Sequence, residues 1–160
     1  MATSLSNLSD FDSVGVPSGE NLKFALVVSE WNNQITENLY KGAYETLLSF
    51  DVLPKNISRT NVPGSFELVF GAKKALEEDV DSVIVIGSVI KGQTKHFDFV
   101  CQGVTQGITM LNLQSKQPVI FCVLTDDTLQ QAIDRSGGVH GNKGVEAAVT
   151  ALKMAHLSQS

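Results

Sequence analysis

Residues 87–98 read GSVIKGQTKHFD and decide how the chain folds, because they join a strand-like apolar run to a segment with helical spacing. The preceding run, residues 82–86, is apolar enough to be a strand buried on both faces. After it, apolar residues recur at helical spacing at Phe97, Cys101, Val104, Ile108 and Leu111. A glycine-bearing loop between a strand and a helix offers free backbone N–H groups and the positive end of a helix dipole, which suit a phosphate. His96 begins the helix beside that site, where a side chain that titrates near neutrality is useful.

Strand-like and helix-like segments alternate along the rest of the chain. Further buried strands are expected at residues 22–28, 57–61 and 119–124, and the intervening segments have helical periodicity. Ser65 is expected to cap the helix that follows residues 57–61. Four buried strands separated by helices predict an α/β fold, a three-layer α/β/α sandwich with a four-stranded parallel sheet, doubly wound and flavodoxin-like.

Ligands of such folds bind outside the carboxyl ends of the strands, where this sequence places its polar and glycine-bearing segments. Trp31, the only tryptophan, falls in one of them and can stack on a heteroaromatic ring, although it could equally be a surface packing residue. Residues 64–67 combine N–H groups, a hydroxyl and a carboxylate, which suits a polyhydroxylated ligand. Arg135, one of two arginines, is a candidate cation for the phosphate or a solvated surface residue.

The chain has 160 residues, a length that predicts one domain. Its net charge of −5 argues against a nucleic-acid binder. We expect an N-terminal arm at residues 1–21, either disordered or ordered against a neighbouring subunit, followed by a single domain at 22–160. No apolar run reaches the length of a membrane helix and no signal peptide is apparent, which favours a cytoplasmic protein. Cys101 and Cys122 are expected to be reduced, and no residue cluster has metal-ligand spacing.

Three segments together resemble the lumazine synthase family, whose members make 6,7-dimethyl-8-ribityllumazine, the precursor of riboflavin. They are VPGSFE at residues 62–67, GQTKHFD at residues 92–98, and GNKG at residues 141–144 followed by EAA at 146–148. The resemblance covers residues 22–157. It implies a transferase that condenses 5-amino-6-ribitylaminouracil with 3,4-dihydroxy-2-butanone 4-phosphate, releasing phosphate and water, without cofactor or metal.

The resemblance also implies a role for individual residues. His96 matches the residue that transfers protons. The positions that match substrate-binding residues are Trp31 as stacking ring, Ser65, Phe66 and Glu67 for the ribityl chain, Ser88, Val89 and Ile90 for the pyrimidine, Gln93, Thr94 and Arg135 for the phosphate, and Phe121 and Lys143 near the pocket. Phe121 is expected to reach into the site of the next subunit.

The resemblance implies a homopentamer with shared sites. The turn at residues 136–142 has no insertion, which favours closure of pentamers into an icosahedral shell, with riboflavin synthase as a further candidate partner. Two other classes stay open. A flavin- or lumazine-binding protein without turnover would use Trp31 and Glu67 but not His96 or Arg135, whereas a purely structural shell protein would need no pocket.

Overall fold

We describe residues 7–159 of the chain in a computed structural model. Its main strands and helices alternate along the sequence. They are β1 (Phe24–Ser29), α1 (Asn33–Ser49), β2 (Ile57–Val62), α2 (Leu68–Ala75), β3 (Ser82–Ile90), α3 (His96–Gln114), β4 (Val119–Asp126), α4 (Leu129–Arg135) and α5 (Lys143–Ser158). Smaller elements are the 3-10 helices η1 (Ser13–Gly15) and η2 (Pro54–Asn56) and the short strands β5 (Ser136–Gly138) and β6 (Gly141–Asn142).

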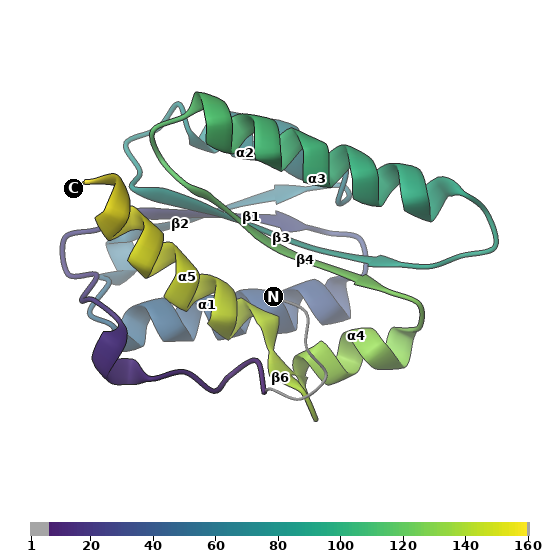
Figure 1. Cartoon of the computed structure of the whole chain (residues 1–160), viewed down its shortest axis with the longest axis horizontal. Helices are drawn as coiled ribbons and strands as arrows, with labels where there is room; N and C mark the ends of the chain where they lie inside the picture. The colour runs from purple at the N-terminus through teal and green to yellow at the C-terminus, as the bar shows by residue number, and fades with distance from the viewer. Residues whose placement is uncertain (1–6, 160) are drawn as a thin grey trace.

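The four main strands form one parallel sheet in the order β2-β1-β3-β4. Helices α2 and α3 cover one face of the sheet, and α1, α4 and α5 cover the other (Figure 1). The predicted three-layer, doubly wound fold is therefore confirmed. The carboxyl ends of the strands lie at one edge of this sandwich, which is where such folds bind ligands.

The core has two halves because successive residues of each strand point to opposite faces of the sheet. In β1, Phe24, Leu26 and Val28 pack with α1 and α5, whereas Ala25 and Val27 pack with α2 and α3. Both sets are buried. This explains why the strands read as continuous apolar runs rather than as alternating ones.

Strand β3 is longer than the sequence predicted, and the expectation of a loop from Gly87 onward is wrong. Pairing with β1 ends at Val28 and Ile86, but pairing with β4 continues to Ile90 and Asp126. The neighbouring strand β4 therefore keeps residues 87–90 extended after β1 has turned away. The connecting loop is shorter than expected and comprises residues 91–95.

The N-terminal residues that are described contact their own chain. The amide of Leu8 donates to the carbonyl of His140, Ser9 Oγ accepts from the amide of Asn142, and Val16 is buried. Residues 1–6 of the expected arm lie outside the described residues. The division of the chain at residue 21 stays a prediction.

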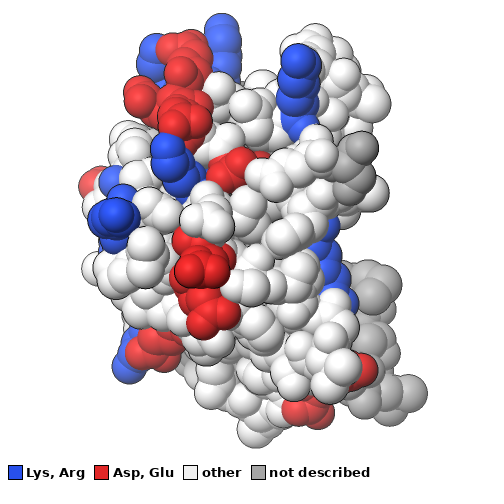
Figure 2. Space-filling view, turned by 90° about the vertical axis from the view of Figure 1, so that its left-hand side faces the viewer, with Lys and Arg blue, Asp and Glu red and all other residues white. Residues whose placement is uncertain are grey.

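The helices, the possible metal-binding side chains and the surface charges of the described residues have the following features. From residue 7 to 159, no helix is both long and apolar enough to cross a bilayer. Within the same range, no group of three or more His, Cys, Asp or Glu could hold a metal ion. On the face in Figure 2, acidic and basic side chains intermingle and form no continuous basic stripe.

Candidate active site

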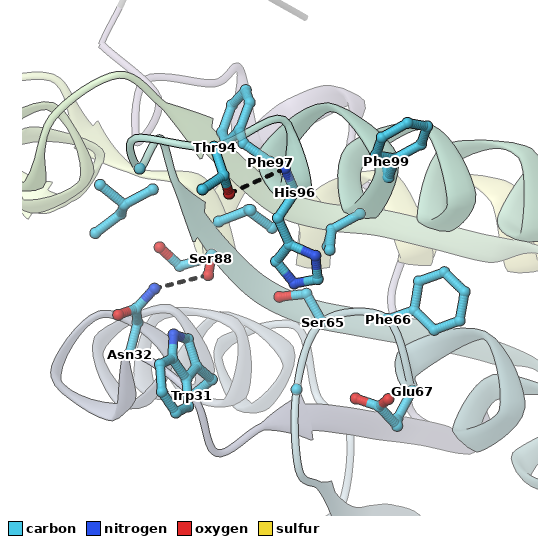
Figure 3. Close-up of a pocket in the computed structure, with 15 residues that line it drawn as sticks. Trp31, Asn32, Ser65, Phe66, Glu67, Ser88, Thr94, His96, Phe97 and Phe99 are labelled. Carbon is cyan, nitrogen blue, oxygen red and sulfur yellow. Dashed lines mark hydrogen bonds between the residues drawn. The ribbon is translucent and has the colours of Figure 1, made fainter.

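A cavity of about 590 Å³ opens at the carboxyl ends of β1, β2 and β3. The β1–α1 loop, the β2–α2 loop, the end of β3 and the start of α3 each contribute side chains to it (Figure 3). The lining residues are Trp31, Asn32, Gly64, Ser65, Phe66, Glu67, Ser88, Val89, Ile90, Gly92, Thr94, His96, Phe97, Phe99 and Val100. Nine of the residues predicted for the site are among them.

The indole of Trp31 forms one side of the cavity. It is 70% exposed, so its ring faces are free to stack on a ligand rather than being covered by the core. Its backbone is fixed from both directions, because its carbonyl accepts from Ser29 Oγ and the next residue, Asn32, begins the turn into α1. Phe66 lies on the opposite side (Figure 3).

Two residues that line the cavity, Ser65 and Ser88, have buried hydroxyls without a hydrogen-bond partner among the described residues. The expectation that Ser65 caps α2 is wrong, since α2 begins at Leu68 and the preceding Glu67 makes no side-chain capping bond. Gly87 explains how Ser65 approaches the sheet, because a Cβ at that position would lie 2.7 Å from Ser65 Oγ. A buried hydroxyl left without a hydrogen-bond partner costs stability.

The loop at residues 91–95 presents unused backbone donors. The amide of Lys91 donates to the carbonyl of Asp126, which ties the start of the loop to β4. The amides of Gly92, Gln93 and Thr94 have no acceptor among residues 7–159. They lie directly before the N-terminus of α3, where the helix dipole favours an anion.

His96 is the first residue of α3, and its backbone amide lies 3.4 Å from Thr94 Oγ1. Its side chain is exposed and lines the cavity, with the imidazole next to Ser65 in Figure 3. The ring can therefore exchange protons both with a ligand in the cavity and with solvent.

The sequence that forms this site matches a known family. The profile of the 6,7-dimethyl-8-ribityllumazine synthases matches residues 21–159. The chain belongs to the 6,7-dimethyl-8-ribityllumazine synthase family. The enzyme of that name from Flavobacterium johnsoniae is 62% identical over 160 residues, 99% of this chain and 84% of the relative. The one from Christiangramia forsetii is 54% identical over 159 residues, 98% and 95% of the two chains. The one from Porphyromonas gingivalis is 55% identical over 160 residues, 99% of each.

Two residues predicted for the lumazine synthase site lie elsewhere in the same chain. Phe121 and Lys143 line a second groove of about 710 Å³, beside the edge strand β4 and helix α5. Lys143 Nζ is 2.6 Å from Glu146 Oε1. Burial alone would raise the pKa of Glu146, but Lys143 is among the groups that lower it instead.

Arg135 and Gln93 line neither cavity. Arg135 ends α4, and its Nη1 lies 3.4 Å from the carbonyl of Gln131. It lies near Asp126, a carboxyl that is only 7% exposed and whose Oδ2 has no hydrogen-bond partner among residues 7–159. Burial raises the pKa of Asp126, the positive charge of Arg135 opposes the rise, and Asp127 adds to it.

The sequence interpretation missed several residues that line the cavity. Asn32 directly follows Trp31, and its position next to a candidate stacking ring was the available signal. Phe99 and Val100 lie one helical turn after His96 and so share its face of α3, which the spacing alone could have shown.

Proposed function

We propose that this chain catalyses the condensation of 5-amino-6-ribitylaminouracil with 3,4-dihydroxy-2-butanone 4-phosphate, the penultimate step of riboflavin biosynthesis. The products are 6,7-dimethyl-8-ribityllumazine, phosphate and water. One observation carries the proposal: in a chain of this family, a single cavity brings together a free indole, two unpaired buried hydroxyls, a loop of unused amides and an imidazole.

Each part of the cavity has a place in this reaction. Trp31 would stack on the pyrimidine, with Ser88, Val89 and Ile90 along its edge. Ser65, Phe66 and Glu67 would hold the ribityl chain, whose hydroxyls match a carboxylate and a buried hydroxyl. Gln93 and Thr94 would hold the phosphate through their free amides.

The chemistry needs two reactants to meet in one orientation. The 5-amino group attacks the ketone to form an imine with loss of water. Phosphate then leaves by elimination, and the ribityl-linked amine closes the ring with loss of water. Holding both reactants in place removes an entropic barrier of up to about 7–11 kcal/mol. Proton transfer by His96 adds a smaller factor of about 10²–10⁴ in rate.

We further propose that the complete site forms between neighbouring subunits of a homopentamer. The residues matched to the family divide between two surfaces of one chain, since Phe121 and Lys143 lie in the groove beside β4. A subunit that presents this groove to its neighbour's cavity would supply Phe121 and Lys143 to the neighbour's site. Closure into an icosahedral shell is the larger assembly that we propose, and riboflavin synthase is a candidate partner to be tested by co-sedimentation.

The deciding experiment mixes the purified protein with both reactants and follows lumazine fluorescence together with phosphate release. Stoichiometric appearance of both supports the proposed reaction. Quenching of Trp31 by the pyrimidine without phosphate release would instead identify a binding protein. If both signals were absent, only a structural role would remain.

A further inference from the structure

Asn32 adopts a backbone conformation that most residues avoid. Its φ of 57° and ψ of 45° lie in the left-handed region, where asparagine is tolerated better than other residues with a side chain. The carbonyl of Asn32 accepts from the amides of Ile35 and Thr36, so this conformation also starts helix α1.

The side chain of Asn32 does not cap the helix that it precedes. Elsewhere in this chain, Asn142 Oδ1 accepts from the amide of Gly144 at the start of α5. Asn32 occupies the same position at α1 and makes no such bond. Its side chain is therefore used for something other than helix capping.

The amide of Asn32 reaches across to strand β3 instead. Nδ2 donates to the carbonyl of Ser88 at 2.9 Å, as the dashed line in Figure 3 shows. Pairing between β1 and β3 has already ended at Ile86, so no strand donor from β1 remains for Ser88. A side-chain amide thus replaces a sheet hydrogen bond at the point where the two strands separate and the cavity opens.

We propose that Asn32 is a positioning residue that sets the separation between the Trp31 ring and the pyrimidine-binding segment Ser88–Ile90. The left-handed turn directs the indole to the cavity, and the bond to Ser88 holds the opposite wall at a fixed distance. This inference rests on the proposed function, because it assumes that a flat ring lies between these walls.

Three variants test whether the hydrogen bond from Asn32 to the Ser88 carbonyl, called the tether below, positions the two walls. Asn32→Gly keeps the left-handed backbone and removes the amide, and Asn32→Asp keeps the shape but turns a carboxylate oxygen toward the Ser88 carbonyl. Asn33→Ala is the matched control, since Asn33 is exposed, adjacent, and its side chain has no partner among residues 7–159. Binding of 5-amino-6-ribitylaminouracil is followed by fluorescence of Trp31, the only tryptophan, and both KM values are measured with kcat.

We expect Asn32→Gly to weaken pyrimidine binding about three- to tenfold, the effect of one neutral hydrogen bond. KM for the butanone phosphate should change less than about twofold, because only the pyrimidine wall depends on this single bond. Asn32→Asp should weaken pyrimidine binding further, and Asn33→Ala should match the wild type.

Unchanged pyrimidine binding in Asn32→Gly would overturn the proposed positioning role of Asn32. Turnover by the wild type would still support the proposed function in that case. An equal rise of both KM values would also overturn the positioning role, because that is the mark of a general structural defect. A wild-type protein that neither binds the pyrimidine nor turns over would overturn both proposals together.

Discussion

At the scale of single residues, the proposed mechanism predicts that substitution of His96 affects kcat, whereas substitution of Arg135 affects KM for the phosphate substrate. His96→Ala should lower kcat by about 10²-fold and leave turnover measurable, because positioning supplies more of the rate than proton transfer. Arg135→Ala should raise KM for the phosphate substrate about tenfold or more, the effect of a lost charged hydrogen bond. Steady-state kinetics with each substrate varied in turn separate the two. Normal binding of the phosphate substrate by Arg135→Ala would contradict its role as the anchor.

Asp126 makes a second prediction at this scale. Burial raises the pKa of its carboxyl, so the folded protein holds this proton to higher pH than the unfolded chain does. Stability therefore declines as pH rises from about 4, the unfolded pKa, through the raised pKa of the folded state. Asp126→Asn should be more stable than the wild type by about 1 kcal/mol at pH 7. Thermal unfolding from pH 4 to 8 checks this, and a gain that did not fade toward pH 4 would contradict it.

At the scale of elements, α1 and α5 approach so closely that only glycine fits between them. A Cβ at Gly144 would lie 1.9 Å from the carbonyl oxygen of Leu39, which is backbone and cannot rotate away. Gly144→Ala should therefore destabilise the protein by about 2–3 kcal/mol despite the better helix propensity of alanine. Gly15→Ala is the control, because a Cβ there meets nothing within 4 Å and its stability should change by less than about 0.5 kcal/mol. Urea unfolding measures both, and equal stability of the two variants would refute the steric argument.

The elements were largely predictable from the sequence, because runs buried on both faces and helical spacing are local signals. The end of β3 was not, since residues 87–90 stay extended through pairing with β4, a partner distant in the sequence. The role of Ser65 was mistaken for a similar reason. A serine before a helix is typical of a cap, but the hydroxyl of Ser65 packs against Gly87 of β3, a contact between segments distant in the sequence.

At the scale of the whole molecule, the separation of Phe121 and Lys143 from the cavity leads to a complementation experiment. Trp31→Ala damages the cavity, and Phe121→Ala damages the groove beside β4. If neighbouring subunits share each site, unfolding and refolding an equal mixture should rebuild about one quarter of the sites without either substitution, as random cyclic assembly requires. Turnover of the mixture is compared with that of each variant refolded alone. A mixture no more active than the average of the two variants would show that each chain carries its own site.

This separation also marks what a single sequence could predict of the site. Residues 64–67 and 88–96 each gather several lining residues next to one another in the chain, so motif spacing located most of the cavity. The placement of Phe121 and Lys143 beside β4, and of Arg135 at the end of α4, depends on packing between distant segments, which no local pattern records.

The tight contact of Gly144 with Leu39 also limits which movements can change the width of the cavity. Helices α1 and α5 are locked backbone to backbone, so the layer that they form cannot slide without breaking this contact. The exposed rings of Phe66 and Phe99 lie outside that layer, in the β2–α2 loop and on α3. A change in the width of the cavity therefore cannot come from sliding of α1 against α5.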